Sequence, residues 1–375
     1  MTSRGGDRRG SLRQLAALFL RLGITAFGGP AAHIGMMQDE VVRRRGWLSD
    51  AEFLDLLGAT SLIPGPSSTE MAIYIGRQRA GWAGILVAGA CFILPAALIV
   101  AIIAWAYVRF GSLPQVVGLL YGVKPVVIAV VVQALLSLRR VALKTRIVMA
   151  MGLAALVASF LGLNVVIVLL GTGLIVALGA WLPRQCRSVK PPAALFGAVP
   201  FGLAPLFLVF LKVGAVLFGS GYVLLAFLRA DLVQRYGWLS ESHLLDAIAV
   251  GQVTPGPVFT TATFIGYLLG GPAGAAAATV GIFLPSFLYV PAIALLLPRI
   301  RRSAVAGAFL DGVNVSALAL MAMVTWQLAR AAIVDAPTAA IAIGSAVLLL
   351  AFRVNSTWLI LGGGAIGLVT RLLAR

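Results

Sequence analysis

The sequence predicts an all-α, polytopic membrane protein made of two homologous repeats of inverted topology, with discontinuous helices that re-enter or break and meet near the midplane. Three observations support this fold class: 61% of the 375 residues are hydrophobic and only 11% charged, short motifs recur at one spacing, and the Lys and Arg bias changes sides between the halves. A soluble domain would be about half apolar and about a quarter charged. The soluble classes are therefore excluded.

The net charge of +17 comes largely from basic residues at the ends of apolar runs. Anionic headgroups and the loop-orientation rule account for such residues, so we expect the lipid bilayer as a partner and no nucleic acid. Residues 1–12 include three arginines and no clear cleavage site, which indicates a retained cytoplasmic tail. The two cysteines and two histidines lack ligand spacing, so we expect no metal and no cofactor.

Motifs that return in the same order indicate a duplication. Gly-Trp-Leu-Ser at 46–49 recurs at 237–240, and Pro-Gly-Pro at 64–66 recurs at 255–257, each 191 residues later. Several ordered matches at one spacing are not expected by chance. The predicted organisation is a first transporter repeat at 13–190, a linker or extra apolar segment at 191–203, and a second, inverted repeat at 204–375.

Each repeat is predicted to begin with a broken helix, followed by two half-helices and four fuller spans. The broken stretches, 12–37 and 205–228, are interrupted near Gly28 and Gly219. The segments beside each Pro-Gly-Pro are only about 15 to 18 Å long as helices, whereas the hydrocarbon core is about 30 Å thick. The half-helices are expected at 52–63, 67–76, 243–254 and 258–268. The fuller spans are expected at 82–107, 114–137, 147–161 and 164–182, and at 272–298, 305–328, 338–352 and 356–372.

The loop charges predict that the second repeat is inserted upside down. In the first repeat one face holds only Arg109, while the other holds Arg77, Arg79, Arg139, Arg140, Lys144, Arg146, Arg184, Arg187 and Lys190. In the second repeat the turn equivalent to Arg109 carries three arginines, and the turn at 268–274 is uncharged. Since short loops rich in Lys and Arg stay in the cytoplasm, the halves are expected to have opposite orientations. The apolar region at 191–205 would cross the membrane once more between the two repeats and so reverse the orientation of the second.

The broken segments are the predicted substrate site. Discontinuous helices at matching positions of two repeats are typical of secondary transporters. A free helix N-terminus with nearby hydroxyl groups binds oxyanions, and proline is tolerated where a helix starts. One Pro-Gly-Pro alone is more simply a loop between helices, but its symmetric recurrence in apolar sequence favours a site. The backbone and hydroxyl candidates are Gly28, Gly29, Pro30, Pro64, Gly65, Pro66, Ser67, Ser68, Thr69, Gly219, Pro255, Gly256, Pro257, Thr260 and Thr261.

Charged residues inside apolar stretches are further candidates. Arg21 and Lys212 occupy equivalent positions before the two helix breaks and are predicted to bind the anion as counter-charges. Snorkelling to the interface is the alternative for either one alone. Glu70, Asp311 and Lys124 lack a like-charged counterpart in the other repeat and are candidates for ion or proton coupling. Each could instead pair with a nearby charge.

These residues carry a resemblance to a known family. Phe-Gly-Gly-Pro-Ala-Ala-His-Ile at 27–34, Glu-Val-Val at 40–42 with Arg-Arg-Gly-Trp-Leu at 44–48, and Leu-Ile-Pro-Gly-Pro-Ser-Ser-Thr-Glu at 62–70 strongly resemble the chromate ion transporter family. The resemblance implies the long-chain, two-domain bacterial form, which exports chromate, confers resistance, and has sulfate as the substrate's analogue. It also implies two antiparallel halves that are both needed.

The second half departs from the family pattern, with Phe-Gly-Ser-Gly at 218–221 and Val-Phe at 258–259, so the first half is expected to hold more of the anion. The resulting hypothesis is a secondary active exporter of chromate, a proton antiporter or potential-driven, in the bacterial inner membrane. A transporter of sulfate or another oxyanion and a passive anion channel are the alternatives. An enzyme is not expected, and no lysine follows a glycine as in a P-loop pump. The oligomeric state is open, with a homodimer as one option.

Overall fold

All regular elements in the described part of the chain are helical. The computed structural model describes residues 4–27, 29–60, 63–111, 113–181, 201–218, 223–300, 304–352, 354 and 356–373. The first half contains α1 (Arg4–Thr25), α2 (Gly29–Gln38), a π-helical segment η1 (Asp39–Arg44), α3 (Asp50–Thr60), α4 (Ser67–Phe110), α5 (Pro114–Ala142), α6 (Arg146–Phe160) and α7 (Val165–Trp181). The second half contains α8 (Leu203–Val216), α9 (Leu224–Leu228), π-helical η3 (Arg229–Arg235), α10 (Glu241–Val253), a 3₁₀ turn η4 (Val258–Thr260), α11 (Thr261–Ile300), α12 (Ala304–Ala332), α13 (Ala336–Leu350) and α14 (Ser356–Leu373).

Four of the described helices are long and apolar enough to cross a membrane. They cover Ser67–Phe110, Pro114–Arg139, Val258–Ile293 and Gly307–Ala332. The shorter apolar helices α6, α7 and α8 lie between the second and third of these spans, and α13 follows the fourth. The helical content and these apolar spans confirm the prediction of an all-α, multi-pass membrane protein.

Both long helices α4 and α11 contain a sharp reversal at the same place in the repeat. Ala80 and Gly81 leave helical geometry, with φ of −142° and 63°, and Gly270 and Gly271 repeat this with −141° and 59°. The two arms pack so closely that a Cβ on Gly76 would lie 2.2 Å from the carbonyl oxygen of Gly84. Each helix is therefore an antiparallel hairpin, and its short first arm is the half-helix that follows Pro-Gly-Pro.

The segments before each hairpin also double back. The guanidinium of Arg79 lies over the Trp47 ring at 4.7 Å and donates to Gln14 Oε1 at 3.4 Å. The middle of α1, the loop after η1 and the end of the first arm of α4 therefore meet. In the second half, Phe201 contacts Trp238, with ring centroids 5.5 Å apart, at the corresponding position.

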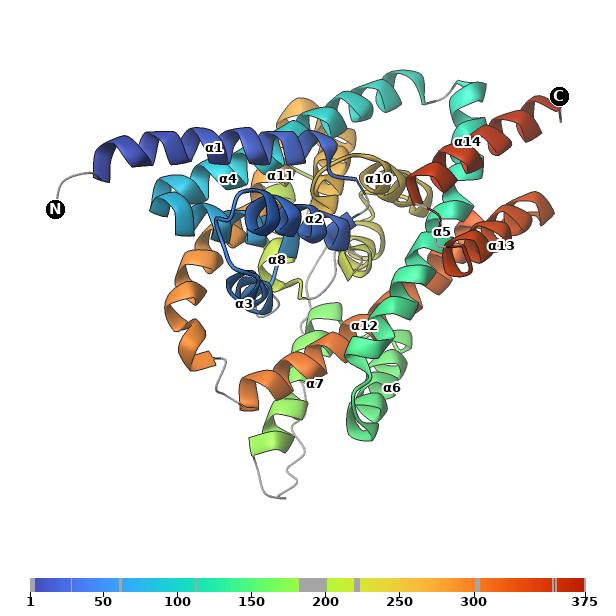
Figure 1. Cartoon of the computed structure of the whole chain (residues 1–375). Coiled ribbons are helices and arrows are strands. Elements are labelled where there is room, and N and C mark those ends of the chain that lie inside the picture. The colour runs from blue at the N-terminus through green and yellow to red at the C-terminus, as the bar shows by residue number, and fades with distance from the viewer. Residues whose placement is uncertain are drawn as a thin grey trace.

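The later helices of each repeat pack on the other repeat. In Figure 1 α5, α13 and α14 lie together on one side of the molecule. Helix α12 packs on both α6 and α7. Paired glycines permit both crossings: a Cβ on Gly122 would lie 1.9 Å from Gly363 O, and one on Gly312 would lie 2.8 Å from Gly173 Cα. The repeats therefore exchange helices.

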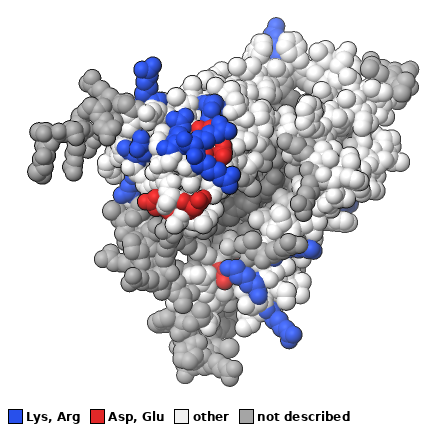
Figure 2. Space-filling view, viewed as in Figure 1, with Lys and Arg blue, Asp and Glu red and all other residues white. Residues whose placement is uncertain are grey.

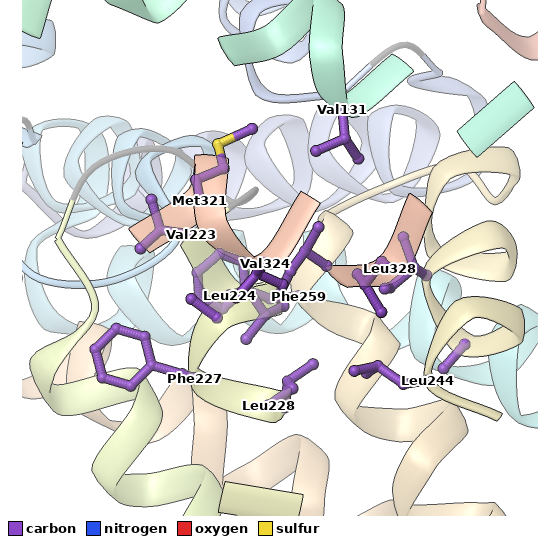
Figure 3. Packing of buried hydrophobic residues seen from close by; sticks show 14 of the residues in the cluster. Val131, Val223, Leu224, Phe227, Leu228, Leu244, Phe259, Met321, Val324 and Leu328 are labelled. Carbon is purple, nitrogen blue, oxygen red and sulfur yellow. The ribbon is translucent and has the colours of Figure 1, made fainter. Parts of the chain in front are cut away.

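The first helices of the two repeats, α1 to α4 and α8 to α11, do not pack equally on the later helices, α5 to α7 and α12 to α14. In Figure 3 residues of α9, α10 and η4, including Leu224, Leu244 and Phe259, gather against Val324 and Leu328 of α12. Helices α1 to α4 instead contribute most of a second, smaller cluster. The first helices of the second repeat, α8 to α11, thus pack on α12 and α5, whereas α1 to α4 of the first repeat largely form a core of their own.

Candidate functional site

The two Pro-Gly-Pro turns and the two helix breaks bond across the repeats. The backbone N–H of Gly65 donates to the carbonyl of Leu217, where α8 ends, at 2.7 Å. The equivalent N–H of Gly256 donates to the carbonyl of Ala26, just after α1, at 2.9 Å. Each Pro-Gly-Pro therefore satisfies the broken helix of the other repeat, and these four chain ends form the candidate site.

The first helix start lies directly after the first Pro-Gly-Pro, where α4 begins at Ser67. Pro66 caps α4 from outside the helix, one position earlier than the first-turn place expected for it. The N–H groups of Thr69 and Glu70 bond to its carbonyl at 2.8 and 3.0 Å. Ser67 and Ser68 open the first turn, whose N–H groups carry the positive end of the helix dipole.

The second helix start differs from the expected one. The turn η4 occupies Val258–Thr260, and α11 begins only at Thr261. The hydroxyl of Thr260 donates to Pro257 O and that of Thr261 donates to Val258 O, both at 2.8 Å. These two threonine hydroxyls already donate to their own backbone. That the first half holds more of the anion stays a prediction.

The other turn residues predicted for the site are only partly described by the structure. Gly29 has a positive φ of 78° at the start of α2, followed by Pro30. Pro64 is half-buried, and Pro255 and Pro257 are buried. The predicted residues Gly28 and Gly219 lie outside the described residues.

Gly65 is tightly enclosed. Its φ of 138° suits glycine alone, and a Cβ there would lie 2.4 Å from Glu70 Oε1 and 2.9 Å from Ser286 Oγ. Glu70 and Ser286 both have no exposed surface. The structure thus places the candidate coupling carboxylate directly beside the first Pro-Gly-Pro.

Both predicted counter-cations already have carboxylate partners. Arg21 Nη2 lies 2.5 Å from Glu40 Oε1, and Lys212 forms an ion pair with Asp231. Glu40 and Asp231 are themselves 191 residues apart, on η1 and η3. The sequence interpretation missed these partners, although the repeat spacing marks them as equivalent. An anion that binds to Arg21 or Lys212 would therefore have to share that cation with a carboxylate.

The carboxylate of Glu40 is held in its charged form. Burial raises its pKa, but hydrogen bonds from Arg21 and Arg45, with the charges of Arg21 and Arg44, outweigh this and hold the pKa below its ordinary value. Figure 2 shows the resulting group of blue side chains around a smaller red one over the region of α2 and η1. This surface is therefore a network of compensated charges.

The other two coupling candidates lie in interhelical ion pairs. Asp311 Oδ1 accepts from Lys144 Nζ at 2.6 Å. Lys124 Nζ lies 3.1 Å from Asp246 Oδ1 of α10 and donates to Ser242 Oγ at 2.8 Å. Both pairs tie α5, or the loop that follows it, to the second repeat. Neither resembles the enclosed setting of Glu70.

His33 is a site residue that the sequence interpretation did not select. It is buried, and its Nε2 donates to Ala26 O, the same carbonyl that accepts from Gly256, at 3.1 Å. The only available signal was its place in the motif after the break. Among the described residues no group of three or more His, Cys, Asp or Glu side chains is arranged to hold a metal ion.

Comparison with known proteins assigns the family. The family described as Chromate transporter matches twice, at residues 13–177 and 204–368, which confirms the two-repeat architecture. The chain is 35% identical to the chromate transport protein of Cupriavidus metallidurans, over 96% of this chain and 93% of that protein. It is 33% identical to the chromate transport protein of Pseudomonas aeruginosa, over 85% and 82%, and 33% identical to a probable chromate transport protein of Synechococcus elongatus, over 88% and 87%. No solved structure gives a comparable match. The chain therefore belongs to the chromate transporter family.

Proposed function

We propose that this protein is a secondary active transporter that exports chromate across the bacterial inner membrane and so confers chromate resistance. The observation that carries the proposal is the reciprocal pair of backbone bonds, Gly65 to Leu217 and Gly256 to Ala26. Discontinuous helices from two repeats that meet in this way form the substrate sites of secondary transporters. The chromate transport proteins among the relatives support the choice of anion.

Two interhelical contacts support an inverted relation of the repeats. Tyr121, near the start of α5, donates to Asp335, and Asp311, near the start of α12, pairs with Lys144 beyond the end of α5. The counterpart of Asp335 in the first repeat is Thr145, which follows the other end of α5. The equivalent positions thus lie at opposite ends of one helix, as an inverted pair requires. The contacts of Arg79 with Trp47 and Gln14 likewise favour re-entrant rather than crossing half-helices.

The direction of transport follows from charge. The membrane potential contributes about 2.3 kcal/mol per charge per 100 mV, so an inside-negative potential favours export of a dianion by roughly twice that. Chromate would bind between the start of α4 and the break after α8, near Arg21 and Lys212. Sulfate, a tetrahedral dianion of similar size, is expected to compete.

Proton antiport would use Glu70 rather than Asp311. Glu70 is enclosed beside Gly65, whereas Asp311 is part-exposed and neutralised by Lys144. A neighbouring anion disfavours the ionised form of a buried carboxylate, so the proton occupancy of Glu70 would depend on whether the anion is bound. Glu70→Gln should abolish the effect of an imposed pH gradient and retain potential-driven transport, with Asp311→Asn as the control. Equal loss in both variants would overturn the assignment to Glu70.

The test of the function is uptake of labelled chromate by inside-out vesicles that contain the purified protein, at a set membrane potential and with sulfate as competitor. Accumulation that follows the potential and is blocked by excess sulfate is expected. Flux that is not coupled to a pH gradient and is far faster than alternating access allows would indicate a passive channel. Sulfate uptake without chromate uptake would assign a different oxyanion to the same site.

A further inference from the structure

Ser286 of α11 lies beside the first Pro-Gly-Pro, although it belongs to the second repeat. A Cβ on Gly65 would lie 2.9 Å from the hydroxyl oxygen of Ser286 and closer still to Oε1 of Glu70. The two side-chain oxygens therefore border the same small space, which the missing side chain of the glycine leaves open. Neither Ser286 nor Glu70 has any exposed surface. Both groups thus have to find their partners inside the protein.

The polar atoms of this pair are not satisfied elsewhere. Within the described part of the chain, the two carboxylate oxygens of Glu70 and the hydroxyl of Ser286 form no hydrogen bond of regular geometry with any residue. The hydroxyl nevertheless lies close enough to the Glu70 carboxyl to influence it. Buried polar groups without partners are costly and rare in native proteins, so this pair needs an explanation other than stability.

Several titratable side chains lie on the helices around the pair. Tyr74 follows Glu70 by four residues on α4, and Tyr289 follows Ser286 by three on α11. The other groups are bonded elsewhere or exposed: Tyr289 donates to Ala215 O, His33 of α2 to Ala26 O and Arg77 of α4 to Pro291 O; Arg21 of α1 pairs with Glu40, Lys212 of α8 with Asp231 and Asp246 of α10 with Lys124; Arg13 of α1 and Asp50 and Glu52 of α3 are exposed. No ion pair among the described residues includes Glu70. The hydroxyl of Ser286 is therefore the polar group that the structure places against its carboxyl.

The equivalent place beside the second Pro-Gly-Pro lacks both groups. Ala96 of α4 is the counterpart of Ser286, since each follows a Leu-Pro pair, and its methyl group is the atom nearest to a Cβ on Gly256. Thr261 is the counterpart of Glu70, and its hydroxyl donates to Val258 O. Each long helix thus supports the turn of the other repeat, but only the first turn has a carboxyl group and a hydroxyl group there. The pair is therefore not a requirement of the repeat fold.

We propose that Ser286 is a positioning residue for the proton on Glu70. A serine hydroxyl can donate to the ionised carboxylate and can rotate to accept from the protonated acid, so it can hold Glu70 in place through both states. The inference rests on the proposed function, in which Glu70 couples proton movement to anion export. It adds that the second repeat supplies the partner of this proton, next to the turn of the first repeat.

The test measures the protonation of Glu70 directly and needs no transport. Dicyclohexylcarbodiimide reacts with protonated carboxyl groups in apolar surroundings, and mass spectrometry of the full chain in lipid vesicles gives the labelled fraction of Glu70 at each pH. In Ser286→Ala half-maximal labelling should occur about one pH unit higher, because the ionised form loses a charge-assisted hydrogen bond. The matched control is Ser316→Ala, which removes another fully buried hydroxyl, one on α12 that donates to Val313 O at 3.0 Å. It should leave the labelling curve unchanged.

Ser286→Cys provides a second variant, because it keeps a side chain of similar size with only a weak donor. It should shift the curve in the same direction, even if the smaller alanine disturbs the fold. An unshifted curve in both variants overturns the proposal. An equal shift in Ser316→Ala also overturns it, since the loss of any buried hydroxyl would then suffice.

The pH profile of chromate uptake separates this inference from the proposed function. If Glu70 couples transport, the profile should move together with the labelling curve in Ser286→Ala. A labelling curve that shifts without any change in the uptake profile would support the pair of Ser286 and Glu70 and remove Glu70 from the coupling. A normal shift of labelling in a protein without chromate uptake would likewise support the pair and count against the proposed function.

Discussion

The N–H of Gly65 and the carbonyl of Leu217 form a hydrogen bond of 2.7 Å that joins the Pro-Gly-Pro of one repeat to the broken helix of the other. Its counterpart joins Gly256 to Ala26. A helix break in hydrocarbon leaves backbone groups unsatisfied at a cost of several kcal/mol each. The repeats therefore stabilise one another's breaks, which explains why both would be needed for a functional protein.

Gly65→Ala should block transport without preventing insertion. The new Cβ would lie 2.4 Å from Glu70 Oε1, and the φ of 138° is strained for any other residue, at a cost of order 1–3 kcal/mol. Shifting this turn would break its bond to Leu217. We expect chromate uptake in vesicles to fall about tenfold or more.

The control for this change is Gly35→Ala in α2, because a Cβ at Gly35 meets nothing within 4 Å. It should transport normally. Wild-type uptake by Gly65→Ala would show that the enclosed geometry of this turn is not required.

Glu40→Gln and Arg21→Gln should change chromate affinity in opposite directions. In the proposed site Glu40 would compete with the anion for Arg21, with which it forms an ion pair, so its neutralisation should lower the KM for chromate, whereas loss of Arg21 should raise it. Vesicle uptake over a range of chromate concentrations measures both. Asp50→Asn, which removes an exposed charge from the start of α3, is the matched control. A similar rise of KM in both variants would show that the Arg21–Glu40 ion pair has a purely structural role.

The spacing of the motifs predicted the parts of this site that depend on local chemistry. Proline lacks the backbone N–H that a helix interior needs and glycine permits a turn, so the breaks at 64–66 and 255–257, where two prolines flank a glycine, could be placed from sequence alone. The reversal at Ala80 and Gly81 also falls in the predicted gap between 76 and 82. These features follow from residue type and from the length of the apolar runs.

Features that depend on packing between distant segments could not be predicted in this way. Lys124 and Asp246 are apart in the chain and meet only because α10 packs on α5. The pairing of Arg21 with Glu40 needs the chain to double back after Ala26, a choice that hydrophobic periodicity does not encode. The turn η4 arises where the serines of the first repeat are replaced by Val258 and Phe259.

Acid should destabilise the protein partly through Glu40. Its pKa in the folded protein lies below its ordinary value, so the pairing stabilises the fold fully above the unfolded-state pKa and is lost as the pH falls through the folded-state pKa. We expect the melting temperature in detergent to drop from about pH 6 to about pH 3. Arg21→Gln should flatten this dependence, because it removes the first of the partners that lower the pKa. An unchanged slope in Arg21→Gln would assign the acid sensitivity to other carboxylates.

Gly122→Ala should weaken the exchange of helices between the repeats. A Cβ there would lie 1.9 Å from Gly363 O, so the backbones of α5 and α14 would have to separate, at a cost of about 1–3 kcal/mol. Gly312→Ala is the equivalent change at the crossing of α12 and α7, where the nearest atom would be 2.7 Å away, and should cost less. Gly362→Ala, with nothing within 4 Å, serves as the control. Size-exclusion chromatography after a series of heating steps should rank the three variants in this order of decreasing damage, and equal stability of all three would mean that the glycine crossings do not hold the repeats together.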